Sequence, residues 1–345
     1  MALHPSLDAA HAAARVWPDT ERALAPQAAA RMAARLADAA DPAWPGHLPV
    51  EVAGMLAGHG CELAAWIAAR HQGIPRRVGL AGGQGSGKST LAGLTAALLE
   101  REFGLTAVVL SLDDLYLSRS RRAQLAADVH PLFATRGVPG THDFALGEAL
   151  LAALVADSGQ VALPRFDKAQ DERLPESEWV RVDTPVDVLL FEGWCVGAAA
   201  EAEAQLEAPV NALERDEDPD GRWRRAVNAA LAGPYASLFG ALEGLVYLAI
   251  PDFAAAGRWR EEQEAELRKR TGGGMTSGQV ERFVAHYERL TRAMQRSMPA
   301  RSDLLLELDE SHRVASVRPG AGSGSRGFRR DSAPGTQHAS GKFRA

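Results

Sequence analysis

The sequence has few cysteines, few lysines and no long apolar run. Cys61 and Cys195 are its only cysteines in 345 residues, too few for a disulfide framework or a zinc knuckle, so a reducing cytoplasm is the expected location. No apolar segment reaches the roughly 18 residues of a membrane span, and the N-terminus lacks the pattern of a signal peptide. The formal net charge of −6 disfavours nucleic acid or an anionic membrane as the main partner. We therefore expect neither as a partner, while the oligomeric state stays open.

The composition changes at both ends of the chain. Residues 1–75 are rich in alanine with interspersed prolines, which predicts a helical N-terminal extension. In residues 318–345 arginine and lysine lie among glycine and serine, and this stretch has too little apolar content to fold. We expect a disordered basic tail there, an inert solvated extension rather than a binding segment. Residues 76–317 then form the main domain.

A phosphate-binding loop is the strongest motif. Gly82 and Gly87 are five residues apart and Lys88 and Ser89 follow, which is the Walker A spacing. Backbone N–H groups of such a loop face phosphate oxygens, the lysine reaches the β- and γ-phosphates, and the serine hydroxyl ligates Mg²⁺. An ordinary glycine-rich turn is the alternative, but only four lysines are present, so a chance match is improbable. The predicted ATP-binding residues are Gly82, Gly83, Gln84, Gly85, Ser86, Gly87, Lys88, Ser89 and Thr90.

The fold class follows from apolar runs that alternate with helical stretches. These runs cover residues 106–114, 186–194, 244–250 and 304–317, besides the strand that precedes the loop. Such a pattern is typical of a parallel sheet covered on both faces. We predict an α/β, three-layer P-loop NTPase fold with a mainly parallel sheet, in which residues 304–317 form a terminal hairpin.

Acidic residues follow two of these runs, where a parallel sheet binds its ligands. Asp113 and Asp114 come after the first run, where a carboxylate could accept a proton from an attacking hydroxyl or help to hold Mg²⁺. Helix capping is the alternative, which for Asp114 weighs equally with function. Glu192 ends the second run and is predicted to orient Mg²⁺, unless it is only a satisfied strand-end glutamate.

Two further segments are rich in cations. Residues 117–180 read as a long loop, and loops of this length are commonly functional, although a charged surface loop is the alternative. Their candidate acceptor-binding residues are Arg136, His142, Asp143, Arg165 and Lys168. Residues 257–275 carry Arg258 and Arg260 on a predicted helix that ends in three glycines. This helix is either a lid that closes over the nucleotide or an exposed helix with paired charges.

The motifs together resemble a known family. They are "GGQGSGKSTL", "SLDDLYL", "RGVPGTHD", "PRFDK", "LLFEGW", "NALERDEDPDGRWRRAVN", "PDF", "RWREEQE" and "GGGM", in this order between residues 48 and 317. The set is similar to the P-loop D-glycerate 3-kinases of the phosphoribulokinase and uridine kinase superfamily.

The resemblance implies roles for individual residues. The family's catalytic base falls on Asp113, its strand-end glutamate on Glu192, and its lid arginines on Arg258 and Arg260, although Glu261 stands where a leucine is more usual. We therefore predict Asp113, Lys88 and Arg260 as catalytic residues and Ser89 and Glu192 as metal ligands.

The resemblance also implies a reaction. We expect a phosphotransferase that uses ATP and Mg²⁺ and acts on a small hydroxy acid, transferring the γ-phosphoryl group to D-glycerate to give 3-phosphoglycerate. Two alternatives stay open. One is a kinase of the same superfamily for another alcohol, such as a pantothenate-like or nucleoside acceptor, and the other is a non-catalytic nucleotide-binding regulator.

Overall fold

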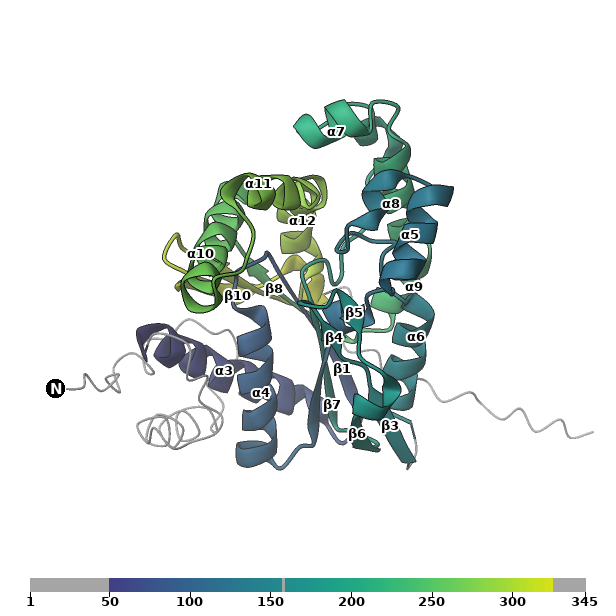
Figure 1. Ribbon diagram of the computed structural model, residues 1–345. Helices are drawn as coiled ribbons and strands as arrows, with labels where there is room; N and C mark the ends of the chain where they lie inside the picture. Colours follow the sequence, from purple (N-terminus) through teal and green to yellow (C-terminus); the bar gives the residue numbers. More distant parts are fainter. Residues whose placement is uncertain (1–49, 157–158, 325–345) are drawn as a thin grey trace, which may run out of the picture.

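The computed structural model describes residues 50–156 and 159–324. Residues 1–49 of the predicted N-terminal extension and residues 325–345 of the predicted basic tail lie outside this part of the chain. The central element is a six-stranded sheet (Figure 1). Its strands, in spatial order, are β10 (Val314–Pro319), β9 (Leu304–Leu308), β8 (Gly244–Ala249), β1 (Arg76–Gly82), β7 (Val188–Gly193) and β2 (Ala107–Ser111).

The sheet is parallel except at one edge, as the sequence predicts. Strand β1 pairs in parallel with β7 on one side and β8 on the other, and only β10 is antiparallel to its neighbour. Every residue of β7 is buried, as expected for a strand covered on both faces. Strands β9 and β10 form the predicted terminal hairpin, and β10 continues to Pro319, past the expected boundary at 317.

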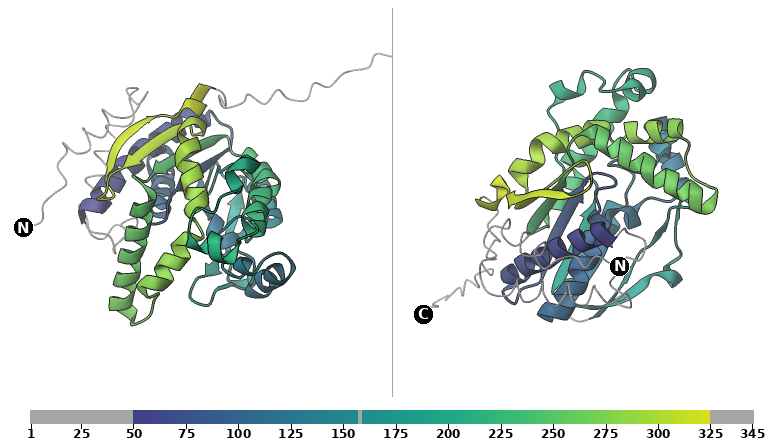
Figure 2. Two further views of the ribbon diagram at one scale, coloured as in Figure 1. Left: turned by 90° about the horizontal axis from the view of Figure 1, so that it is seen from above. Right: turned by 90° about the vertical axis from the view of Figure 1, so that its left-hand side faces the viewer.

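Helices cover both faces of the sheet, so the predicted three-layer architecture is confirmed. One face carries α3 (Val50–His71), α4 (Lys88–Phe103) and part of α10 (Phe253–Thr271), whose apolar residues share one core cluster. The other carries α6 (Phe144–Ala153), α9 (Pro234–Gly240) and α12 (Glu288–Arg301). Figure 2 shows α3 beside α4 in its right-hand view. Helix α3 can pack closely because Gly60 lies against Leu98 of α4.

A smaller unit stands beside the carboxyl ends of the strands. It contains α5 (Arg119–Asp128), α7 (Ala212–Glu217) and α8 (Arg222–Ala232) and has its own apolar cluster around Phe133 and Trp223. Opposite it lie α10 and α11 (Ser277–Ala285) (Figure 1). The short 3₁₀ helices are η1 (Leu112–Leu115), η2 (Pro131–Ala134), η3 (Glu176–Glu178), η4 (Glu203–Leu206) and η5 (Ala321–Gly324).

The interpretation of residues 117–180 as a long loop is wrong. This stretch forms α5 and α6, and then two small antiparallel pairs. Strand β3 (Gly159–Leu163) pairs with β6 (Val180–Thr184), and β4 (Phe166–Asp167) pairs with β5 (Glu172–Arg173). The "PRFDK" segment therefore contains the first strand of a β-hairpin and the start of its turn.

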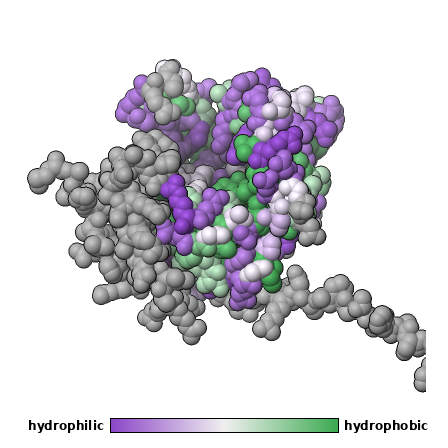
Figure 3. Space-filling view, turned by 90° about the horizontal axis from the view of Figure 1, so that it is seen from below, coloured by the Kyte–Doolittle hydropathy of each residue, from purple (hydrophilic) through white to green (hydrophobic). Residues whose placement is uncertain are grey.

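The edge opposite the carboxyl ends is seen from below in Figure 3, where apolar residues show between polar ones. Within the described residues, none of the helices combines the length and the apolar character needed to span a bilayer.

Candidate active site

The predicted phosphate-binding loop connects β1 to α4. Gly85 and Gly87 have φ angles of 78° and 81°, in the left-handed region that favours glycine. A Cβ atom on Gly85 would also lie 2.8 Å from Cβ of Trp259. The backbone conformation therefore favours glycine at both positions, and the close approach of α10 leaves no room for a side chain at position 85.

The loop leaves donors available for an anion. Helix α4 begins at Lys88 without a side-chain cap, so the first N–H groups of a 16-residue helix point into the loop together with the positive end of its dipole. The Ser86 hydroxyl is buried and has no partner in the described part of the chain. Polyphosphate oxygens fit this arrangement of unpaired donors.

Glu192 lies next to this loop because β7 pairs with β1. Its Oε1 accepts a hydrogen bond from the Ser89 hydroxyl at 2.9 Å, whereas Oε2 is buried and without a partner among the described residues. Mg²⁺ usually takes one or two protein oxygens and completes its shell with phosphates and water. The Ser89 hydroxyl and the unpaired Glu192 oxygen fit this requirement, so these two residues would hold the ion. Within the described residues, no group of three or more His, Cys, Asp or Glu side chains forms a metal cage.

Asp113 follows β2 at the same edge. Its Oδ1 accepts from the Tyr116 hydroxyl at 2.8 Å and its Oδ2 from the Lys168 ammonium at 2.6 Å. Burial acts to raise the pKa of this carboxyl, but the positive charges of Lys168 and Lys88 outweigh it and lower the pKa to about 2. Asp113 is therefore a carboxylate that faces the phosphate loop across the pocket.

Asp114 points the other way. It accepts hydrogen bonds from Arg165 at 2.8 Å and from the backbone N–H of Phe166 at 3.0 Å. The idea that Asp114 caps the next helix is wrong, because Ser118 caps α5. Asp114 instead fixes the β4–β5 hairpin, which places Lys168 over Asp113.

The other predicted acceptor-binding residues separate into two groups. Arg136 lines the pocket with Lys168, pairs with Asp171, and its Nη2 donates to the Lys168 carbonyl at 3.3 Å. Arg165, His142 and Asp143 do not line it. Each of these three has a partner of its own, respectively Asp114, the Tyr235 hydroxyl and the N-terminus of α6.

His142 has a structural role, because it does not line the pocket but packs against Tyr116, which does. It is buried, its ring stacks on Tyr116 at 4.6 Å between centroids, and its Nδ1 is 2.6 Å from the Tyr235 hydroxyl. Burial lowers its pKa to about 3. The ring is therefore neutral near pH 7 and supports Tyr116, which in turn holds Asp113.

The two arginines that the sequence predicts for a lid lie on different sides of α10. Arg260 lines the pocket and its guanidinium lies 5.2 Å from the ring centroid of Phe283, while Arg258 pairs with Glu310 in the β9–β10 turn. Glu261 accepts from Arg268 at 2.8 Å and from Ser277 at 3.1 Å. This polar link between α10 and α11 accounts for a glutamate where the family more usually has a leucine.

These side chains surround one pocket of about 260 Å³, with more polar than apolar lining. Its residues are Gln84, Gly85, Gly87, Lys88, Ser89, Thr90, Asp113, Tyr116, Arg136, Lys168, Trp194, Arg260, Gln263, Phe283 and Tyr287. The arrangement places phosphate donors, a carboxylate and cations around one space.

Known proteins resemble this chain in sequence and in fold. No protein-family model matches it. A solved D-glycerate 3-kinase from Cryptococcus neoformans aligns with a TM-score of 0.64 and 26% identity over 77% of this chain and 99% of that one. The chloroplastic D-glycerate 3-kinase of Arabidopsis thaliana is 28% identical over 62% of this chain, which spans 46% of that protein. An uncharacterized kinase of Schizosaccharomyces pombe is 34% identical over 63% of this chain and 79% of its own length.

The chain belongs to the same family of P-loop kinases as the S. pombe protein. The chain's longest motif lies outside the pocket. In "NALERDEDPDGRWRRAVN", Asp218 is fully buried, accepts from the first N–H groups of α8 and pairs with Arg224. Glu214 of the same motif is 1% exposed and pairs with Arg289 of α12 at 2.6 Å. This family motif holds the small unit to the kinase core.

Several residues in or beside the pocket carry roles that the sequence motifs do not predict. Tyr287 donates from its hydroxyl to the Arg136 carbonyl at 3.1 Å, and its ring packs edge-on against Trp194. Trp194 lies directly after "FEG", which is a usable signal, whereas Tyr287 lies in the turn between α11 and α12 and has no such motif beside it. His312, in the β9–β10 turn, approaches the Gly85 carbonyl to 3.1 Å with its Nδ1 and stacks on Trp259.

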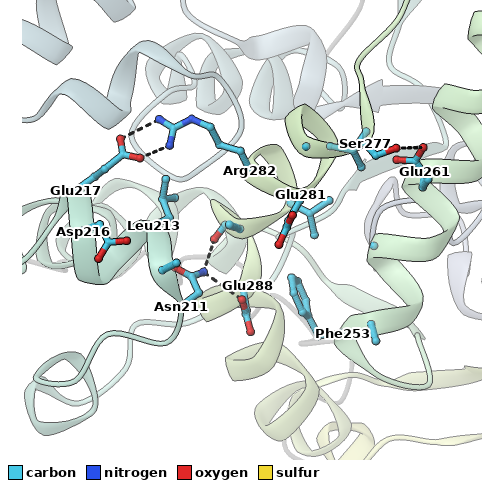
Figure 4. A pocket seen from close by; sticks show the side chains of 17 residues that line it. Asn211, Leu213, Asp216, Glu217, Phe253, Glu261, Ser277, Glu281, Arg282 and Glu288 are labelled. Carbon is cyan, nitrogen blue, oxygen red and sulfur yellow. Dashed lines mark hydrogen bonds and ion pairs between the residues drawn. The ribbon is translucent and has the colours of Figure 1, made fainter.

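A larger cavity, of about 580 Å³, separates α7 from α10 and α11 (Figure 4). Its carboxylates are Asp216, Glu217, Glu261, Glu281 and Glu288. Most of them pair with nearby arginines, as the Glu217–Arg282 contact in Figure 4 illustrates. The phosphate loop and Asp113 do not line this cavity but line the smaller pocket.

Proposed function

We propose that the protein transfers the γ-phosphoryl group of ATP to the 3-hydroxyl of D-glycerate, giving 3-phosphoglycerate and ADP. The observation that carries this proposal is the shared pocket of Lys88, Asp113, Arg136 and Lys168. A three-carbon hydroxy acid needs a cation for its carboxylate, a base for its hydroxyl and a phosphate site, and this pocket offers all three. The similarity to two D-glycerate 3-kinases supports the same reaction.

Each group has a task in this reaction. Lys88 and the loop N–H groups hold the β- and γ-phosphates, and Asp113 accepts the proton of the attacking hydroxyl. Mg²⁺, when bound, supplies charge neutralisation at the phosphates, and Ser89 and Glu192 hold it. Arg260 of α10 reaches the same space and stabilises the charge of the transferring group as the lid closes.

Arg136 is the best anchor for the acceptor carboxylate. Arginine can donate two parallel hydrogen bonds to a carboxylate, and Arg136 lines the pocket whereas Arg165 does not. His142 and Asp143 do not line the pocket, and we propose that they support the residues of the acceptor site. We also propose residues 76–317 as the kinase domain, preceded by an extension of which α3 is the described part. The cytoplasmic location stays a prediction.

A coupled screen of ADP release tests the proposal with small hydroxy acids, sugars and nucleosides as acceptors. We expect D-glycerate to give the highest kcat/KM and phosphorus NMR to identify 3-phosphoglycerate. Formation of 2-phosphoglycerate, or rapid turnover of another alcohol beside none of glycerate, would refute the substrate. ADP release without any phosphorylated acceptor under all conditions would instead indicate a regulator.

A further inference from the structure

The base of the proposed reaction is held in an ion pair. Both oxygens of Asp113 already accept a hydrogen bond, Oδ1 from Tyr116 and Oδ2 from Lys168. The Lys168 contact, at 2.6 Å, joins opposite charges. It makes the carboxylate a weaker proton acceptor than a free aspartate, because the nearby cation favours its charged form.

Among the groups around Asp113, Lys168 is the charged one that can change its ion-pair partner. The other titratable side chains that face this carboxylate are Lys88 of α4, Tyr116 after η1, His142 before α6, Cys195 after β7 and Tyr287 before α12. Burial keeps the histidine, the cysteine and both tyrosines neutral near pH 7, since it lowers the pKa of His142 and raises those of the other three. The neighbouring Asp114 is paired with Arg165. The mobile charge is thus one of two lysines, and Lys88 belongs to the phosphates.

The surroundings of Lys168 suit a change of partner. Its side chain is 62% exposed, and it lies in the turn between β4 and β5. Arg136 donates to its backbone carbonyl, so the two cations are neighbours at the pocket wall. A carboxylate bound by Arg136 therefore arrives beside the Lys168 ammonium.

We propose that Lys168 gates the base: it pairs with Asp113 while the acceptor site is empty and pairs with the carboxylate of a bound hydroxy acid instead. This inference rests on the proposed function, because the acceptor must be an anion. The exchange frees Asp113 Oδ2 only when an acceptor with a carboxylate is bound. The acceptor's carboxylate thus both anchors the molecule and activates the reaction.

In the transfer step, one bond to the γ-phosphorus forms and another breaks. The acceptor hydroxyl gives its proton to Asp113 Oδ2 while its oxygen forms a bond to the γ-phosphorus. The bond from the γ-phosphorus to the β–γ bridging oxygen breaks, and its electron pair leaves with ADP. Water and uncharged alcohols carry no group that can draw Lys168 away, so both react slowly in the same pocket.

The test measures ADP release by the full-length protein with Mg²⁺-ATP under four conditions. These are no acceptor, D-lactate, glycerol and D-glycerate. Lactate has the carboxylate but lacks the 3-hydroxyl, and glycerol has the hydroxyls but lacks the carboxylate. In the unmodified protein we expect lactate to raise ATP hydrolysis about tenfold, because a change of one unit in the pKa of a base alters its strength tenfold.

Lys168→Gln removes the gate. We expect hydrolysis without acceptor and turnover of glycerol to rise about tenfold, lactate to have no further effect, and the KM for glycerate to rise more than tenfold. Lys168→Arg keeps a cation and should keep both side reactions slow. Lys269→Gln, at an exposed lysine of α10, is the matched control and should change none of these rates.

The inference is overturned if lactate leaves hydrolysis by the unmodified protein unchanged, or if Lys168→Gln loses glycerate transfer with no gain on glycerol or water. In the second case Lys168 is only an anchor. The lactate measurement needs no variant, so the test survives a variant that fails to fold. If the unmodified protein makes no 3-phosphoglycerate, the proposed function fails while the responses to lactate and to Lys168→Gln still decide the gate.

Discussion

Replacing Asp113 by asparagine separates its role in transfer from its role in the fold. The amide keeps an oxygen for the Tyr116 hydroxyl but presents a donor to Lys168, so the ion pair is lost at nearly constant shape. We expect ATP binding to persist and phosphoryl transfer to fall by about 10²- to 10⁴-fold. The lower end is favoured because phosphoryl transfer is loose and needs little help from a base.

The same substitution has a predictable effect on stability. The pKa of Asp113 is lowered from 3.8 to about 2, a difference that corresponds to about 2 kcal/mol of folding free energy at neutral pH. Its side chain is 29% exposed, so solvent screening reduces this to about 1–2 kcal/mol. Because the folded-state pKa is the lower one, the contribution is complete above about pH 4 and disappears as the pH falls toward 2.

Urea unfolding at pH 7 and at pH 3, together with initial rates of transfer and ATP titrations, measures these effects. Asp183→Asn, at an exposed carboxylate of β6, is the control and should change neither rate nor stability. If Asp114→Asn proves more damaging to transfer than Asp113→Asn, the two carboxylates have the opposite roles and the reasoning is refuted.

Four further substitutions have distinct expected outcomes. Lys88→Ala should lower kcat at least about a hundredfold, since one lost donor to the developing charge costs about 3 kcal/mol; near-normal turnover by the folded variant would remove the phosphate-loop assignment. Arg260→Ala should lower kcat by about 10²- to 10³-fold, whereas Arg258→Ala, whose pair with Glu310 lies outside the pocket, should have little effect; equal losses in steady-state assays would contradict the assigned orientation of α10. Arg289→Met should lower the free energy of unfolding by about 3–5 kcal/mol, because Glu214 would keep a buried charge without its partner; a loss below about 1 kcal/mol in urea titrations would show that Glu214 reaches solvent.

The sequence predicted the parts of the site that follow strands and failed where tertiary contacts decide. Gly87, Asp113 and Glu192 lie at the carboxyl ends of apolar runs, and a parallel sheet must bring such ends together. Nothing local distinguishes Arg136, which lines the pocket, from Arg165, which pairs with Asp114. Both are arginines beside glycine or proline, and only the packing of the β4–β5 hairpin separates them.

The failure over residues 117–180 has a related cause. Glycine and proline mark turns, and their density there predicts a loop. Strands β4 and β5 are each two residues long, too short for an alternating pattern, and ion pairs to Asp113 and Asp114 hold the hairpin in place. Such contacts join residues about fifty positions apart and leave no local signal.

The contact between His312 and the carbonyl of Gly85 bears on how the protein is made. The two residues are 227 positions apart, so a ribosome completes the phosphate loop long before it reaches the turn that supports it. Trp259, which packs on both Gly85 and His312, also emerges late. A nascent chain that ends before the β9–β10 turn lacks the histidine that meets the loop carbonyl, so its phosphate loop is without this contact. Nucleotide binding by stalled chains of increasing length should therefore strengthen only after residue 312 has left the exit tunnel.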